Sequence, residues 1–78
     1  MKIAVIIPNW NGERALPACL DSLVAQTQPA TIIVVDNGSS DGSVDLVRNK
    51  YPQVELVALP KNKGFTGGVN AGIKRFIE

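Results

Sequence analysis

Three short apolar runs divide the chain, and none of them alternates between apolar and polar positions. The runs cover residues 3–7, 31–35 and 54–59. Apolar runs of this length, rich in β-branched residues, are typical of strands that are buried on both faces of a parallel sheet. The third run contains Glu55, which indicates a strand nearer to water. We therefore predict three strands, which end close to Pro8, Asp36 and Pro60.

Between the runs, apolar residues recur every three or four positions, which is the spacing of one face of an α-helix. The first such segment predicts a helix over residues 13–26, with Pro17 in its first turn. The same spacing places Cys19 in the core. A shorter helix is predicted after Gly42, with a core face formed by Val44, Val47 and Tyr51.

A third helix is predicted near the end of the chain, opened by Gly67 and Gly68. Its apolar positions predict one buried stripe, formed by Val69, Ile73, Phe76 and Ile77. The order is then β-α-β-α-β-α, which predicts an α/β, Rossmann-like fold with a parallel three-stranded sheet in three layers. A first strand that is apolar on both faces favours neighbours on both sides. Three strands leave that edge exposed, so the sheet is predicted to be unfinished.

Polar residues and glycines concentrate in the segments that follow the strands, which are residues 8–12, 36–42 and 62–70. Loops that leave the carboxyl ends of parallel strands meet at one edge of a sheet, where ligands bind. The loops at the opposite end, residues 27–30 and 51–53, are short and plain. This asymmetry predicts a binding site at the carboxyl edge.

Asp36 follows a buried strand directly, so its carboxylate is placed to accept hydrogen bonds from a nucleobase or a ribose hydroxyl. The alternative is that Asp36 caps the next helix or makes an Asx-turn with Gly38. We expect Asp41 to support the second helix rather than to contact a ligand. Trp10 is either a stacking surface for a base or sugar, or a hydrophobic anchor of its loop.

The glycines of the third loop match neither phosphate-binding pattern, because their spacing is neither GxGxxG nor GxxxxGK[ST]. We favour the interpretation that these glycines allow left-handed backbone angles or close packing of the third helix, rather than phosphate binding. Lys61 and Lys63 are expected to be solvated. Asn70, expected in the first turn of the third helix, is a stronger candidate for a ligand contact.

Composition removes several classes of function. The chain has 78 residues, which is room for one small domain, and a net charge of +1, without the basic excess of a nucleic-acid-binding protein. It contains no histidine, which excludes Ser-His-Asp and Cys-His catalysis within these residues. Cys19 is the single cysteine, which suits a reducing compartment and a cytoplasmic location.

Three strings together resemble the start of family 2 glycosyltransferases, closest to the rhamnosyltransferase-like branch. They are VIIPNWNG at residues 5–12, VVDNGSSDGS at 34–43 and NKGFTGGVNAGI at 62–73. The resemblance covers essentially the whole chain. It implies that residues 1–78 are the N-terminal part of a single GT-A domain, which binds a nucleotide-diphosphate sugar. In a full-length enzyme it also implies a location at the inner membrane face.

The resemblance implies a nucleotide site, with Pro8 and Asn9 beside the nucleoside and Asp36 on the base, commonly uracil or thymine. The third loop would close the pocket. The nucleotide-binding residues expected on this basis are Pro8, Asn9, Asn11, Asp36, Asn37, Gly38, Phe65, Gly67 and Asn70. The full-length enzyme would transfer sugar from a UDP- or dTDP-sugar to an acceptor hydroxyl, in cell-surface polysaccharide synthesis.

The family pattern continues into a fourth strand with an Asp-x-Asp-type motif that holds Mg²⁺ or Mn²⁺, and later into a general base. These 78 residues contain neither, so we expect no catalytic residue, no metal site and no sugar transfer by this chain alone. The alternative is a non-catalytic assembly or nucleotide-binding module that completes its sheet as a homodimer through the first-strand edge. A flavodoxin-like or response-regulator-like domain fits the loops less well.

Overall fold

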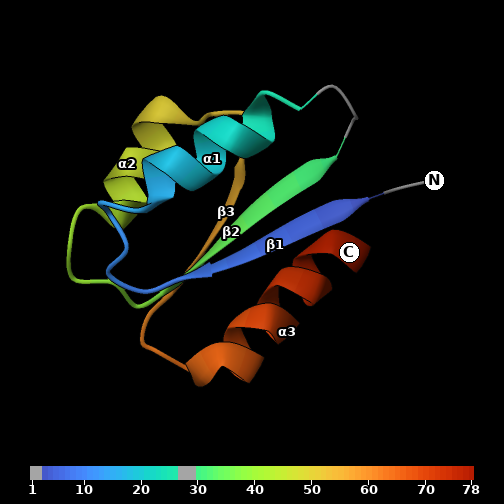
Figure 1. The fold of residues 1–78 in the computed structure, drawn as a ribbon. Helices are drawn as coiled ribbons and strands as arrows, with labels where there is room; N and C mark the ends of the chain where they lie inside the picture. Colours follow the sequence, from blue (N-terminus) through green and yellow to red (C-terminus); the bar gives the residue numbers. More distant parts are fainter. Residues whose placement is uncertain (1–2, 27–29) are drawn as a thin grey trace.

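The computed structural model describes residues 3–26 and 30–78, which form three strands and three helices in alternation (Figure 1). In chain order the elements are β1 (Ala4–Asn9), α1 (Leu16–Val24), β2 (Thr31–Asn37), α2 (Ser43–Lys50), β3 (Glu55–Leu59) and α3 (Gly64–Ile77). The predicted β-α-β-α-β-α order is confirmed. Part of one loop expected to be plain, residues 27–29, lies outside the described residues.

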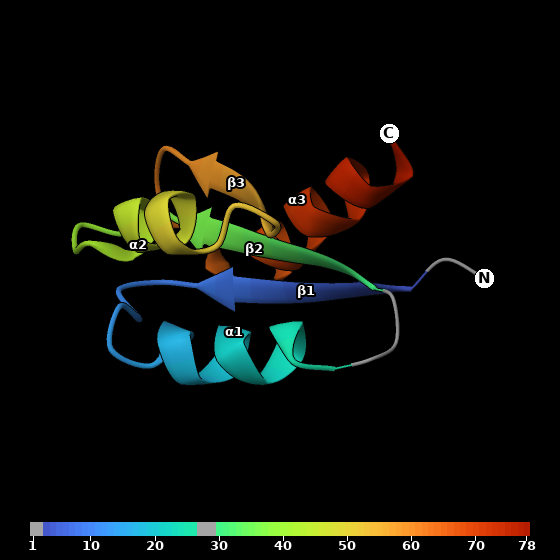
Figure 2. The same cartoon turned by 90° about the horizontal axis from the view of Figure 1, so that it is seen from above.

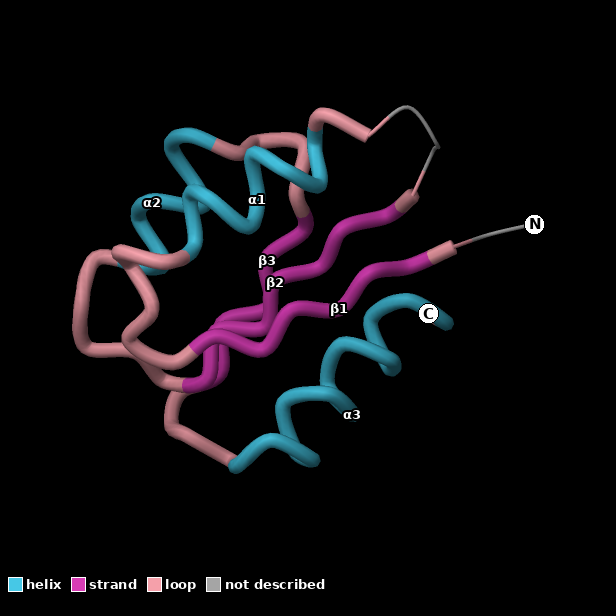
Figure 3. Tube along the Cα trace, in the orientation of Figure 1, coloured by secondary structure: helices cyan, strands magenta, loops and turns pink. Residues whose placement is uncertain are grey.

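The three strands form one parallel sheet in the order β1-β2-β3, so β2 is the central strand (Figure 3). Its side chains at Ile33, Val34 and Val35 are fully buried. The pairing places Ala4 opposite Thr31. β2 continues past its apolar run through two polar residues, and both are buried because neighbouring strands and loops enclose this end of the sheet.

Helices cover both faces of the sheet, as a parallel sheet requires. α1 and α2 lie on one face and α3 lies on the other (Figures 1 and 2). On the first face, the core cluster consists of Leu16, Leu20, Val34, Val47, Tyr51 and Val54. The Tyr51 hydroxyl donates a 2.7 Å hydrogen bond to Asp21 Oδ1, which joins the end of α2 to α1. This hydrogen bond raises the pKa of Tyr51 above its usual value.

The prediction that Cys19 belongs to the core is wrong, because its side chain is exposed. α1 packs on the sheet through Leu16 and Leu20, which are one helical turn apart, and Pro17 lies in its first turn as predicted. Cys19 is on the flank of that narrow stripe. The buried side of α1 is therefore narrower than the apolar stripe of its sequence, which includes Cys19.

The predicted core stripe of α3 is also wrong in part, since Ile73 is 45% exposed and Ile77 is 74% exposed. The helix packs through its glycines instead. A Cβ atom on Gly72 would come within 3.1 Å of Val35 Cγ2 and nearer still to Ile6, so only glycine allows this approach of helix and sheet. The closest line of contact is therefore the glycine side of the helix, and part of the apolar stripe is left in water.

In the described part of the chain, β1 pairs with β2 alone, and its other edge has no partner strand. The predicted exposed first-strand edge is therefore present. Exposed apolar side chains include Ile3 just before β1 and Val24 at the end of α1. Among the described residues, no helix is long and apolar enough to cross a bilayer.

Candidate functional site

Three buried polar side chains end the first two strands at the carboxyl edge of the sheet. They are Asn9 on β1 and Asp36 and Asn37 on β2. The parallel register sets Asn9 opposite Asp36 and Asn37 opposite Leu59. Buried polar groups require hydrogen-bond partners, so their contacts show how this edge is organised.

The Asp36 carboxylate is 2% exposed and lies at the centre of the edge. Its Oδ2 accepts a 2.9 Å hydrogen bond from the Ser39 backbone N–H. Its Oδ1 accepts hydrogen bonds from Ser39 Oγ at 2.7 Å and from Asn9 Nδ2 at 3.1 Å. Asp36 thus makes the local turn bond that was one of its two predicted roles, with Ser39 in place of Gly38, and it fixes the orientation of Asn9.

The β1–α1 loop and the β2–α2 loop are joined by reciprocal hydrogen bonds. Asn11 N–H donates to Ser39 Oγ at 2.8 Å, and Asn11 Oδ1 accepts from Ser40 N–H at 2.8 Å. Glu13 N–H donates to Asp41 Oδ2 at 3.1 Å, and Glu13 Oε1 accepts from Gly42 N–H at 3.1 Å. Asn11 has a positive φ of 51°, a conformation that asparagine tolerates better than most residues. Asn11 therefore connects the first loop to the second through both its backbone and its side chain.

Asp41 supports the second helix, as predicted. Its Oδ1 accepts the Ser43 backbone N–H at 2.9 Å and also the Ser43 hydroxyl. These bonds lower the pKa of Asp41 below its usual value, with the Ser43 hydroxyl as the largest cause. The same carboxylate accepts the hydrogen bond from Glu13 N–H, so Asp41 connects the start of α2 to the first loop.

The β3–α3 loop is attached to the sheet mainly through Asn37. Asn37 Oδ1 accepts from Lys63 N–H at 2.8 Å, and Asn37 Nδ2 donates to Gly64 O at 2.9 Å. Within the loop, Asn62 Oδ1 accepts from Gly64 N–H at 2.7 Å. Gly38, with φ of 76°, lies against the loop backbone, and an added Cβ would be 2.7 Å from Asn62 N. These contacts start α3 at Gly64, before the glycine pair expected to open it.

A pocket of about 330 Å³ opens between the first and third loops. It is lined by Pro8, Asn9, Trp10, Asn37, Asn62, Gly64 and Phe65. Trp10 is 59% exposed and Phe65 is 74% exposed, so both aromatic rings are available to a ligand. Trp10, Asn62 and Gly64 were not among the expected nucleotide-binding residues, although stacking on a base or sugar was one of the two predictions for Trp10. The signal for Trp10 in the sequence was a large aromatic residue within a polar loop.

The predicted site residues fall into three groups. Four of them line the pocket: Pro8, Asn9, Asn37 and Phe65. Three others lie beside or behind its wall in the loop contacts described above: Asn11, Asp36 and Gly38. Gly67 faces the Lys63 side chain. Asn70 is exposed in the second turn of α3, and the prediction of a first-turn position is wrong because the helix begins earlier.

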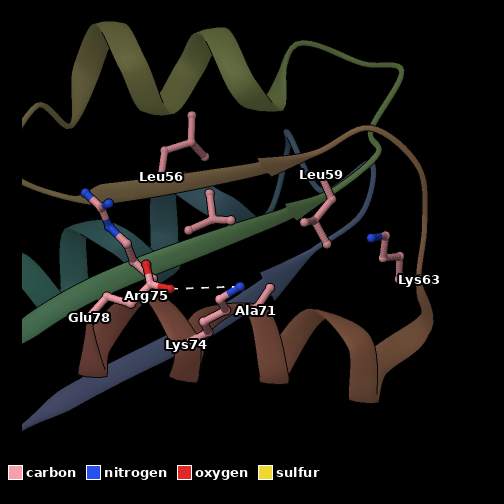
Figure 4. A pocket seen from close by; sticks show the side chains of 8 residues that line it. Leu56, Leu59, Lys63, Ala71, Lys74, Arg75 and Glu78 are labelled. Atoms are coloured by element: carbon pink, nitrogen blue, oxygen red, sulfur yellow. Dashed lines mark ion pairs between the residues drawn. The ribbon is translucent and has the colours of Figure 1, made fainter.

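A second pocket, of about 510 Å³, lies between β3 and α3 (Figure 4). Leu56 points from β3 toward the α2 side, while Leu59 points toward α3 (Figure 4). Two of the lining cations have acidic partners. Lys74 Nζ is 3.9 Å from Glu78 Oε1, and Arg75 Nη2 is 3.2 Å from Glu55 Oε1. These pairs reduce the positive charge that this groove can offer to an anion.

The acidic residues of the described chain do not fit a divalent metal site. Mg²⁺ and Mn²⁺ need several free oxygen ligands at one point. Over residues 3–26 and 30–78, no cluster of three or more acidic, histidine or cysteine side chains exists. Asp36 and Asp41 already use both oxygens for hydrogen bonds within the loops.

Comparison with known proteins agrees with this geometry. The family described as "Glycosyl transferase family 2" matches residues 4–76. A poly(ribitol-phosphate) beta-glucosyltransferase of Bacillus spizizenii is 41% identical over 73 residues, which is 86% of this chain and 12% of the relative. The crystal structure of S. aureus TarS 1-349 superposes with a TM-score of 0.84 at 28% identity, over 96% of this chain and 24% of the TarS 1-349 chain.

The mannosyltransferase PcManGT from Pyrobaculum calidifontis, solved with GDP-Man and Mn²⁺, superposes with a TM-score of 0.81. Its identity is 24%, over 95% of this chain and 24% of PcManGT, so it shows the shared fold. The described chain thus spans about a quarter or less of each of these proteins.

Proposed function

This chain belongs to glycosyl transferase family 2, and we propose that it forms the nucleotide-binding part of a sugar transferase. In this proposal, residues 1–78 are the N-terminal part of a single GT-A domain. The enzyme moves a sugar from a UDP- or dTDP-sugar to an acceptor hydroxyl in cell-surface polysaccharide synthesis. The observation that supports it best is the pocket at the carboxyl edge, where two exposed aromatic rings meet three carboxamide side chains.

The pocket has the chemistry that a nucleoside requires. Aromatic rings such as Trp10 and Phe65 stack on a base, and such stacking contributes about 1–3 kcal/mol for each base. The carboxamides of Asn9 and Asn62 offer both donors and acceptors to the edge of a base or to ribose hydroxyls. Asn37 lines the pocket beside them, with its carboxamide bonded to Lys63 and Gly64. We assign Pro8 to the apolar wall beside the nucleoside.

Residues behind the wall act through these contacts. We assign to Asp36 the task of orienting Asn9, since its carboxylate accepts the Asn9 amide hydrogen bond. Asn11 and Gly38 maintain the loop positions. Gly67 leaves room for the Lys63 side chain, whose Cβ would be 2.7 Å from a Cβ added at Gly67. Asn70 is assigned no nucleotide contact, because its exposed position in the second turn of α3 is outside the lining of the pocket.

The test is a two-dimensional NMR titration of the isotope-labelled chain with UDP, dTDP and GDP, each with and without Mg²⁺. We expect amide shifts at Asn9, Asn37 and Phe65 and a shift of the Trp10 indole N–H. The shifts should depend little on Mg²⁺, because Asp36 and Asp41 are occupied by protein hydrogen bonds. An absence of shifts at millimolar nucleotide would refute the assignment of this pocket.

We propose that the metal and the chemistry belong to other parts of the full-length enzyme, for which Mg²⁺ or Mn²⁺ is expected. Residues 1–78 alone should therefore transfer no sugar in a product assay with UDP-glucose and an acceptor. Detected transfer would overturn this part of the proposal. We place the enzyme in the cytoplasm, at the inner membrane face, where an exposed free thiol such as that of Cys19 remains reduced.

The unpaired edge of β1 supports a second candidate function, that of an assembly module which completes its sheet by dimerisation. Exposed strand edges recruit partner strands, and exposed apolar side chains at Ile3, Ile73 and Ile77 add to that tendency. Analytical ultracentrifugation, combined with the nucleotide titration described above, decides between the two. A stable dimer that binds no nucleotide would favour the assembly module, and a monomer that binds UDP would favour the transferase part.

A further inference from the structure

The three loops around the pocket are held in two different ways. The first two loops bond to each other at Asn11 and Glu13, through backbone groups of both loops. Asn37 connects the third loop to the sheet with two side-chain hydrogen bonds. This side chain stands at the end of the central strand, where β2 gives it a fixed position.

The Asn37 carboxamide is confined on several sides. It is buried, and its Nδ2 is only 3.2 Å from the position that a Cβ on Gly68 would take. Lys63 N–H requires an acceptor and Gly64 C=O requires a donor, so the two bonds fix which end of the amide is which. A carboxamide supplies both functions in one plane. Neither an alkyl side chain nor an ionised carboxylate does so.

The residue that follows this attachment is Phe65, which lines the mouth of the pocket. Phe65 is 74% exposed, so packing against the core does little to hold it. Phe65 is the second residue of α3, so its position follows the backbone at which the helix begins, Lys63 and Gly64. That backbone is the part to which Asn37 bonds.

We propose that Asn37 is a positioning residue, a latch that holds the β3–α3 loop and thereby keeps Phe65 over the pocket. The effect on the ligand rests on the proposed nucleotide function; the latch itself does not. In this view, removing the latch releases the loop while the paired first and second loops retain their geometry. Asn37 then affects the affinity for the nucleotide only through the position of Phe65.

The test compares Asn37→Ala, Phe65→Ala and the double variant, with Asn49→Ala as the control. Asn49 is an exposed asparagine on α2, away from the pocket. Hydrogen exchange of the backbone amides is followed by NMR without ligand. UDP affinity is measured from the fluorescence of Trp10, which is the only tryptophan of the chain. Asn37→Ser, which retains a smaller donor and acceptor, provides a second variant if the alanine chain does not fold.

We expect Asn37→Ala to accelerate exchange of the Lys63 amide at least about tenfold, because its hydrogen-bond acceptor is lost. Exchange at Ser39 and Ser40 should stay as in Asn49→Ala and the unchanged chain. Asn37→Ala and Phe65→Ala should each weaken UDP binding about tenfold, and the double variant should be no weaker than either.

The latch would be refuted if the Lys63 amide exchanged at the same rate in Asn37→Ala as in the unchanged chain. Losses of affinity that multiply in the double variant would also refute it, because Asn37 would then contact the nucleotide independently of Phe65. A failure of the unchanged chain to bind UDP, dTDP or GDP refutes the nucleotide function alone. The exchange measurement still decides the latch in that case.

Discussion

The pair formed by the first and second loops differs sharply from the third loop, although all three surround one pocket. The pair is joined by hydrogen bonds that run in both directions, with Asn11 and Glu13 each acting as donor and acceptor. The third loop is joined to β2 through the Asn37 carboxamide and the close approach of Gly38. The site thus has one wall with many supports and one wall with few.

This difference suggests a division of tasks within the pocket. Local opening requires the loss of only those contacts that hold the segment, so a segment with few contacts opens at a lower free energy. The well-supported wall carries Asn9, whose amide is oriented by the Asp36 carboxylate. The other wall carries Phe65, which is 74% exposed and directly follows the two residues that Asn37 holds. We expect the first wall to set recognition and the second to set the rate of release.

The largest effect is expected from Gly38→Val, which disturbs both walls at once. Gly38 has φ of 76°, and an added Cβ would be 2.6–2.7 Å from the backbone of Lys61 and Asn62. Strain and overlap together should lower the free energy of unfolding by about 3 kcal/mol. Urea denaturation followed by circular dichroism measures this. A loss below about 0.5 kcal/mol, the usual size for a surface substitution, would show that the third loop moves aside easily.

Asp36→Asn should act on the well-supported wall alone. The substitution retains the shape of the side chain but replaces one buried acceptor by a donor, which faces donors from Asn9 and Ser39. We expect a loss of about 2 kcal/mol in the free energy of unfolding, since a buried donor is left without a partner. Urea denaturation gives the loss. Exchange at the Lys63 amide should remain unchanged, and faster exchange there would mean that the two walls are coupled.

Much of this architecture follows from the sequence because it depends on short-range patterns. Apolar runs fixed the strands, and parallel strands bring their following loops to one edge. Asp41 was assigned correctly, because its partner Ser43 is two residues away. The roles of Asp36 remained open, since a carboxylate accepts equally from a nucleobase and from Ser39.

What the sequence did not reveal depends on contacts between distant segments. The start of α3 is set by Asn37, which is 26 residues before Lys63. The packing side of α3 is set by the fit of Gly72 against Ile6 on β1, so the apolar stripe that contains Ile73 gave the wrong side. Helical periodicity identifies an apolar stripe, but the shape of the opposing surface decides how much of it is covered.

Asn11→Ala should have a smaller effect, again on the pair of loops. It removes the Oδ1 acceptor used by Ser40 N–H, and it places alanine at a φ of 51° that alanine adopts poorly. The expected loss is about 1 kcal/mol in the free energy of unfolding. Asn11→Gly is the matched control, because glycine removes the same bonds but accepts the backbone angle. If the two variants lose equal stability, the side-chain bonds carry the effect; if glycine loses much less, the backbone angle does.

The smallest effect concerns pH and the junction of the paired loops with α2. Hydrogen bonds from Ser43, above all from its hydroxyl, lower the pKa of Asp41 in the folded chain. A lowered folded pKa means that the ionised form stabilises the fold above the unfolded pKa of about 4, and that this contribution is lost as pH falls through the folded pKa. Asp41→Asn should therefore have a lower urea midpoint than the unchanged chain at pH 7, and the gap should narrow below pH ~4. Because Asp41 is exposed, the gap should also shrink in high salt. A gap that stays constant from pH 7 to pH ~3 would show that the carboxylate acts by its shape rather than by its charge.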